Sequence, residues 1–174
     1  MDPERLVFID ESAAKTNMTR LRGRCARNQR LVCSAPHGHW RTTTMISAIR
    51  VNGTTATMAI EGATDTEVFR AYVRDVLLPS LRTRDIVIMD NLSPHKNQET
   101  IDLIESVGAR VEFLPAYSPD LNPIEKMWSK VKASLRSQEA RNHEDLIAAI
   151  AKAIASVSSN DARNWFAYCG YSFI

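Results

Sequence analysis

The sequence predicts an α/β protein built on a mixed five-stranded sheet with helices on its faces. Residues 42–60 are rich in β-branched side chains and contain Asn52-Gly53, a pair typical of a tight hairpin. After Gly62, segments with helical periodicity alternate with short apolar strands, and from residue 121 onward helical periodicity dominates. This order favours an antiparallel meander joined to parallel strands, with helices packed on both faces.

Length and composition indicate one globular domain over residues 1–174. The chain is 44% hydrophobic and 24% charged, and its net charge of +2 does not by itself indicate a nucleic-acid partner. Cys25, Cys33 and Cys169 show no C-x-x-C spacing, so neither a disulfide framework nor a zinc site is expected, and a reducing compartment such as the cytoplasm fits. No apolar run approaches the roughly 18 residues of a membrane span.

The first predicted strand covers residues 6–10 and ends in an acid. Alternation along a strand places Leu6, Phe8 and Asp10 on one face and puts Ile9 and Glu11 on the other. Chain exits at strand ends are common positions for functional side chains, so Asp10 is a candidate site residue. The alternative is an ordinary solvated carboxylate at the end of a strand.

An irregular, strongly basic segment is expected over residues 12–30, followed by a short apolar strand over residues 31–34. Guanidinium groups stay charged and fork onto phosphate oxygens, so an arginine cluster beside an acidic site suits a nucleic-acid backbone. The alternative is a solvated basic loop. The candidate DNA-binding residues here are Arg20, Arg22, Arg24, Arg27 and Arg30.

The middle of the chain contains a second strand that closes on an acid. A hairpin over residues 42–50 and 54–60 leads into a helix capped by Thr64 or Asp65 and ending near Pro79. Residues 85–90 then form a buried strand that ends at Asp90, as the first strand ends at Asp10. A helix over residues 96–107 ends at Gly108, and residues 111–114 form the last strand.

A proline-rich loop leads from the last strand into a helix with a carboxylate in its first turn. Asn122 suits the N-cap position and Pro123 the first helical position, so Glu125 is presented from a stiff base. The alternative is that Glu125 only complements the helix N-terminus. The helix continues to about Ser137, with Lys126 and Lys130 one turn apart on a basic flank. Helices over residues 143–157 and from Ser159 follow.

Three carboxylates from separate elements are therefore expected to converge: Asp10, Asp90 and Glu125. Hard oxygen ligands in a group of three suit Mg²⁺ or Mn²⁺ rather than zinc. Two such ions can activate an attacking oxygen and stabilise a leaving oxygen in a displacement at phosphorus. Crowded carboxylates raise one another's pKa unless a cation lies among them, and this cost is the physical reason to expect metal.

Three motifs resemble the catalytic domain of the mariner superfamily of transposases, most closely its bacterial insertion-sequence branch. They are Phe8-Ile9-Asp10-Glu11-Ser12, the run from Met89 to Lys96, and Tyr117-Ser118-Pro119-Asp120-Leu121-Asn122-Pro123-Ile124-Glu125-Lys126-Met127-Trp128. The spacing between Asp90 and Glu125 also matches that family. The resemblance covers nearly the whole chain.

This resemblance implies an RNase H-like fold in which Asp10, Asp90 and Glu125 bind two Mg²⁺ or Mn²⁺ ions. It implies cleavage of double-stranded DNA at transposon ends and transfer of the freed 3′-hydroxyl to target DNA. It further implies a homodimer on DNA, acting on chromosomal or plasmid DNA in the bacterial cytoplasm. Asn91 and His95 fall in the second motif, where they are expected to support Asp90 or a phosphate.

One departure from the family leaves two other functions open. Family members carry N-terminal helix-turn-helix modules, whereas this chain opens only a few residues before the first catalytic strand, so such a module is expected to be absent. The first alternative function is an RNase H-like nuclease without strand transfer. The second is an inactive DNA-binding remnant.

Overall fold

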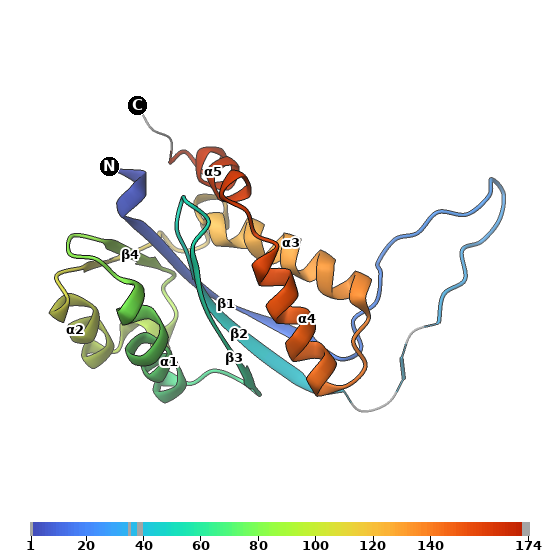
Figure 1. Ribbon diagram of the computed structural model, residues 1–174, viewed down its shortest axis with the longest axis horizontal. Helices are drawn as coiled ribbons and strands as arrows, with labels where there is room; N and C mark the ends of the chain where they lie inside the picture. The colour runs from blue at the N-terminus through green and yellow to red at the C-terminus, as the bar shows by residue number, and fades with distance from the viewer. Residues whose placement is uncertain (1, 35, 38–39, 172–174) are drawn as a thin grey trace.

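A mixed sheet of five strands, in the order β3-β2-β1-β4-β5, forms the centre of the protein (Figure 1). The computed structural model describes residues 2–34, 36–37 and 40–171. β2 is antiparallel to β1 and β3, whereas β4 is parallel to β1 and β5 is parallel to β4, so the predicted mixed sheet is confirmed. The strands are β1 (Leu6–Lys15), β2 (Thr42–Ile49), β3 (Thr55–Glu61), β4 (Ile86–Met89) and β5 (Arg110–Phe113).

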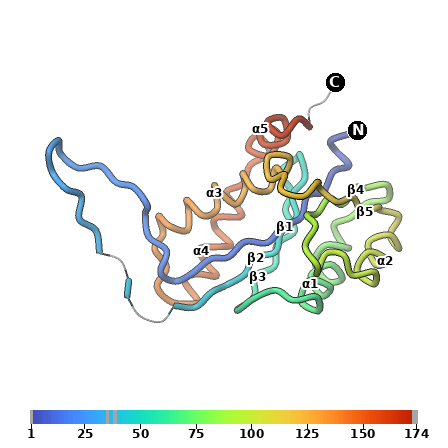
Figure 2. The backbone as a smooth tube through the Cα atoms, turned by 180° about the vertical axis from the view of Figure 1, so that it is seen from behind, coloured from blue at the N-terminus to red at the C-terminus, as the bar shows by residue number. Residues whose placement is uncertain are grey.

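Helices cover both faces of this sheet (Figures 1 and 2). Leu6 and Phe8 of β1 point into one apolar core with the buried side chains of α3, α4 and α5. Val7 and Ile9 point into a second core with those of α1 and α2. The helices are α1 (Thr66–Tyr72), α2 (Gln98–Ser106), α3 (Pro123–Gln138), α4 (His143–Ala155) and α5 (Ser159–Tyr168). None of the helices in the described part of the chain has the length and apolar character that a membrane span needs.

The β2–β3 hairpin turns where the Asn52-Gly53 pair predicted it. The Asn52 side chain accepts a hydrogen bond from the Thr54 backbone N–H at 2.9 Å. Gly53 has φ +86°, in the left-handed region, and a Cβ there would lie 2.9 Å from the Ser159 backbone nitrogen. Glycine is therefore required both by the turn and by its close approach to the start of α5.

β1 is longer than the sequence predicted, which changes the position of Asp10. The strand continues to Lys15, so Asp10 lies in its middle, opposite Ser47 of β2. The prediction that the strand ends at Asp10 and that residues 12–15 are irregular was therefore wrong. The error arose because pairing with β2 extends the strand to Lys15. The local sequence after Asp10 has no hydrophobic alternation that would indicate this long-range pairing.

Two further elements differ from the prediction. Residues 31–34 are exposed and form no strand, because no neighbouring strand pairs with them. Of the helix expected over residues 96–107, Lys96 belongs instead to a 3-10 turn, η4 (Ser93–Lys96), and α2 begins at Gln98. The division occurs at Asn97, whose side chain accepts a hydrogen bond from the Thr100 N–H and so caps α2.

Between β1 and β2, the described residues 16–34, 36–37 and 40–41 belong to a long arm that projects from the body (Figures 1 and 2). Its base is closed where the Thr16 N–H donates to the Arg41 carbonyl, and the Arg41 N–H donates to the Thr16 hydroxyl. The Arg141 guanidinium, from the turn between α3 and α4, donates to the Thr16 and Met18 carbonyls. The point at which the arm leaves the body is therefore fixed by hydrogen bonds on both sides.

Candidate active site

One hollow of about 430 Å³ brings the three predicted acids together. Asp10 comes from β1, Asp90 follows β4, and Glu125 lies in the first turn of α3. The remaining wall is largely apolar and is formed by the segment from Leu114 to Pro119 together with Asn91, Leu92 and Asn122. Sequence reasoning therefore identified three carboxylates that share a hollow in the fold.

The sheet register explains why Asp10 and Asp90 meet. β1 and β4 run parallel, with Phe8 opposite Ile88. Asp10 lies two residues after Phe8, and Asp90 lies two residues after Ile88. At this point β4 has ended, whereas β1 continues alongside β2. In the described residues β4 does not pair with β1 beyond Phe8, and the hollow beside the two carboxylates leaves room for a ligand.

Helix α3 supplies the third carboxylate. Its buried residues Ile124, Met127 and Trp128 pack in the same core as Leu6 and Phe8 of β1. This packing places the helix start over the face of the sheet that carries Asp10. Glu125 is exposed, in the position expected of a side chain that contacts a ligand rather than the core.

The three carboxylates influence one another electrostatically, and the pKa of Asp10 shows the consequence. Burial, followed by the negative charges of Glu125, Glu11 and Asp90, raises the pKa of Asp10 to about 7, although a backbone hydrogen bond at Glu11 opposes the shift. An acid beside two other acids holds its proton to a higher pH unless a cation replaces that proton. A bound divalent cation would remove this repulsion.

His95, which belongs to η4, contacts the Asp90 carboxylate and does not itself line the hollow. The His95 side chain is fully buried, and its Nδ1 lies 2.7 Å from Asp90 Oδ1, off the line of a regular hydrogen bond. Its Nε2 lies 3.1 Å from both carboxylate oxygens of Glu11. Burial lowers the pKa of His95, but Asp90 and Glu11 outweigh it and raise that pKa to about 9. The ring is therefore an imidazolium at neutral pH.

The same contact acts on Asp90. Burial raises the pKa of the Asp90 carboxyl, but His95 and the Leu92 N–H outweigh burial and hold the pKa below its usual value. Asp90 is consequently ionised at neutral pH, whereas Asp10 is close to half-protonated. Two carboxylates with pKa values pushed apart in one hollow are typical of a functional site.

Asn91, the other expected supporting residue, stabilises the wall of the hollow. Its side-chain amide donates to the Leu114 carbonyl at 2.5 Å. Leu114 directly follows β5, and its N–H donates to the Met89 carbonyl. The contact therefore ties the chain leaving β4 to the chain leaving β5 next to the acids.

The donor set fits a divalent cation, although its side chains are not gathered around one point. In the described residues no three His, Cys, Asp or Glu side chains lie close enough together to hold one ion. Asn122 adds an oxygen: it occupies the N-cap position of α3 but makes no capping hydrogen bond, and its buried Oδ1 has no partner among the described residues. Mg²⁺ takes few protein oxygens and keeps several waters, so carboxylates lining a hollow without touching suit it.

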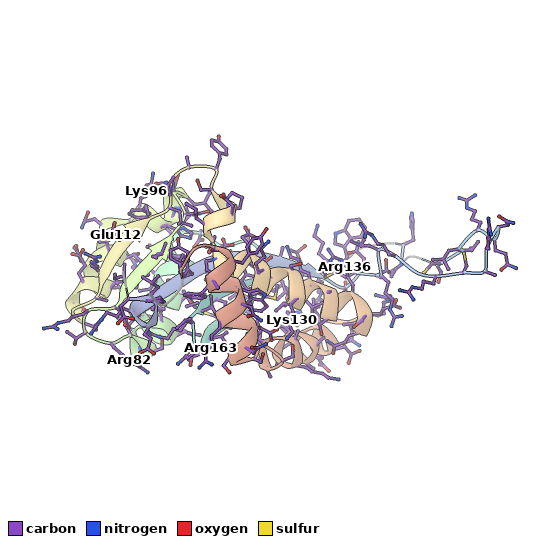
Figure 3. The ribbon with its side chains drawn as sticks, turned by 90° about the horizontal axis from the view of Figure 1, so that it is seen from above. Arg82, Lys96, Glu112, Lys130, Arg136 and Arg163 are labelled. Atoms are coloured by element: carbon purple, nitrogen blue, oxygen red, sulfur yellow. The ribbon has the colours of Figure 1, made fainter. Side chains whose placement is uncertain are left out.

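The candidate DNA-binding residues lie elsewhere. All five arginines are exposed on the arm, and none of them lines the hollow. Lys126 Nζ lies 4.1 Å from the Tyr168 ring centroid, in a cation–π contact. Lys130 donates to the Ser156 carbonyl and to Asp161 at 2.5 Å, a contact that links α3 to α5, so we assign it a structural role. Figure 3 shows Lys130 beside the helices and Lys96 at the end of the body away from the arm.

Sequence reasoning missed three residues that the structure places at the site. Glu11 reaches His95 across 84 positions of the chain, a contact that local patterns do not reveal. Asn122 was interpreted only as a cap. Tyr117 lies on the rim of the hollow, fully exposed and with φ +59°, an uncommon value for a residue other than glycine. Its place between Pro115 and Pro119 was the available signal.

A family comparison identifies the class of protein. Residues 5–147 match the family described as DDE superfamily endonuclease, so the chain belongs to that family. It is an endonuclease domain of the DDE type. A comparison with curated protein sequences gave no significant match.

Solved structures of Mos1 transposase share the fold. The Mos1 paired-end complex with the left transposon end matches with a TM-score of 0.73 and 17% identity, over 94% of this chain and 51% of that one. The Mos1 strand transfer complex gives 0.72 and 18%, over 95% and 51%. The Mos1 catalytic domain with raltegravir and Mn gives 0.68 and 15%, over 94% and 76%. This chain thus has the RNase H-like fold of that catalytic domain and spans about half the length of the transposase in the first two complexes.

Proposed function

We propose that this protein is the catalytic domain of a transposase, cleaving DNA at transposon ends and joining the freed ends to target DNA. The observation that carries the proposal is the single hollow shared by Asp10, Asp90 and Glu125. Membership of the DDE superfamily endonucleases and the fold shared with Mos1 transposase support it. Solved Mos1 complexes with Mn and with Mg support the use of a divalent cation.

The three acids would hold two Mg²⁺ or Mn²⁺ ions, with Asp10 and Asp90 sharing one and Glu125 completing the second site. Bound there, such ions supply activation of the attacking oxygen and charge stabilisation of the leaving oxygen. Asp90 is already ionised and ready to bind a cation. Asp10 must lose its proton, and with a pKa of about 7 it is already partly ionised near neutral pH, so cation binding would displace the remaining proton. The largely apolar wall on the Leu114–Pro119 side would limit the access of bulk water to one side of a bound phosphate.

The arm is the surface we assign to the DNA backbone. Its arginines are exposed, unlike Lys130, and can neutralise phosphates without reading sequence. Lys126 follows Glu125 in the chain and is suited to a phosphate near the reacting one. We further propose that the substrate is double-stranded DNA of a bacterial insertion sequence, that the protein acts on it as a homodimer, and that it does so in the cytoplasm. Inverted repeats flanking the gene would support this origin.

A nicking assay on supercoiled plasmid with Mg²⁺ or Mn²⁺ tests the acids. We expect Asp90→Asn to abolish nicking while the far-ultraviolet circular dichroism spectrum stays unchanged. Asp102→Asn is the matched control, since Asp102 is an exposed aspartate on α2 outside the hollow. Wild-type nicking by folded Asp90→Asn protein would refute the assignment.

A joining assay separates a transposase from a nuclease. The protein is incubated with a pre-cut transposon end carrying a free 3′-hydroxyl, a target plasmid and Mg²⁺. We expect covalent end–plasmid products. Cleavage without joining would identify an RNase H-like nuclease instead, and neither product would indicate an inactive DNA-binding remnant.

A further inference from the structure

We propose that Glu11 is a positioning residue that acts through His95 to fix the carboxylate of Asp90. The inference rests on the proposed function, because it concerns how the same acidic site is built. Glu11 itself does not line the hollow that contains Asp10, Asp90 and Glu125. Its effect on that site must therefore be transmitted by another side chain.

Glu11 is fixed on the opposite face of the sheet from Asp10. It pairs with Ile46 of β2, and alternation along β1 turns it towards the α1 side, where Val7 and Ile9 are also buried. Its side chain is only 15% exposed. A largely buried carboxylate on a central strand is costly unless it is paired, and His95 is the partner that the structure provides.

His95 has little freedom to turn. Its side chain has no exposed surface, and its ring centroid lies 4.4 Å from that of Phe69 of α1. Nε2 is 3.1 Å from both Glu11 oxygens, and Nδ1 is 2.7 Å from Asp90 Oδ1. Rotating the ring by half a turn would direct carbon atoms at both carboxylates, so the Glu11 contact selects the orientation in which Nδ1 faces Asp90.

The two oxygens of Asp90 have different surroundings. Oδ1 accepts the Leu92 N–H at 3.0 Å and lies 2.7 Å from His95 Nδ1. Oδ2 has no hydrogen-bond partner in the described part of the chain, and Asp90 lines the hollow. The contacts of Oδ1 with the Leu92 N–H and His95 therefore leave Oδ2 available to bind a cation. Groups that orient ligating carboxylates commonly change metal affinity about 10- to 100-fold when removed.

Calorimetric titration with MnCl₂ tests the proposal. Because Glu11 acts one residue further away than His95, we expect Glu11→Gln to weaken Mn²⁺ binding about 10-fold. Glu112→Gln is the matched control: it removes one negative charge from a strand residue outside the hollow, and we expect unchanged affinity. Unchanged affinity in folded Glu11→Gln protein would overturn the proposal and leave Glu11 a purely structural role.

A double-mutant cycle tests whether the effect passes through His95. His95→Asn keeps a donor near the position of Nδ1 but cannot reach Glu11. If the route is through His95, adding Glu11→Gln to His95→Asn causes no further loss of affinity. Independent, additive losses would overturn the route. Thermal unfolding of every variant identifies any that fail to fold.

A metal-free measurement separates this inference from the proposed function. The ¹³C carboxyl resonance of Asp90 is compared in the wild type, Glu11→Gln and Glu112→Gln in EDTA. We expect it to move only in Glu11→Gln, and an unmoved resonance would overturn the positioning role. If the wild type binds no Mn²⁺ but this resonance moves, the proposed function fails while the positioning of Asp90 stands.

Discussion

Asp10 is the side chain whose protonation we expect to change the stability of the metal-free protein most. Its pKa rises from 3.8 to about 7 on folding, so the folded state binds a proton more tightly than the unfolded state. The resulting stabilisation is complete below the unfolded pKa and is lost as the pH rises through the folded pKa. Metal-free protein should therefore lose stability between about pH 4 and pH 7.

The size of the effect follows from the shift. Each pH unit inside this window changes the free energy of unfolding by about 1.4 kcal/mol per proton. Asp10 keeps some contact with solvent, which screens the repulsion, so we expect about half of the ideal change. Between about pH 4.5 and pH 6.5 the contribution of Asp10 is then on the order of 1–2 kcal/mol.

Urea unfolding in EDTA, followed by tryptophan fluorescence, measures this contribution. The window of about pH 4.5–6.5 avoids the other shifted groups of the site. The pKa of His95 rises from 6.5 to about 9, so its stabilisation is complete below 6.5 and is lost above it. Asp90 has a lowered pKa, and its contribution is lost only below its ordinary value of 3.8. Asp10→Asn should remove the loss of unfolding free energy that the wild type shows across this pH window. Equal pH dependence in wild type and Asp10→Asn would refute the reasoning.

Two further outcomes follow from other parts of the structure. Arg50→Met should lower the free energy of unfolding, measured in urea, by about 3–5 kcal/mol, because it leaves the buried Asp85 carboxylate without its guanidinium partner. A decrease below about 1 kcal/mol would contradict this expectation. Replacing the arm arginines by glutamine should weaken DNA binding and reduce the slope of log K against log salt by about 0.9 for each phosphate that the arm no longer neutralises. An unchanged slope in a filter-binding assay would show that the arm does not bind phosphates.

Local patterns were sufficient to predict much of the fold and the three acids. The hairpin at Asn52-Gly53 and the start of α3 at Pro123 depend on residues that restrict their own backbone. Asp90 could be placed because a strand followed by an acid is a local pattern. The order of strands and helices then limited where three distant carboxylates could meet.

What could not be predicted depends on contacts between distant segments. The length of β1 is set by β2, and residues 31–34 form no strand because no neighbour pairs with them. Asn122 occupies the expected N-cap position, but its side chain is buried and makes no capping hydrogen bond. The contact between Glu11 and His95 depends on how β1 and η4 are packed, which neither segment specifies alone.

The short length of β4 explains how one region can carry both the acids and their support. β4 pairs with β1 only as far as Phe8, so the next residues of β1 have one open edge. At that edge Asp10 faces the α3 side and Glu11 faces the α1 side. The chain leaving β4 supplies Asp90 to the first side and His95 to the second. If β4 continued along β1, backbone pairing would occupy this edge, so the early end of β4 is what allows the site to form.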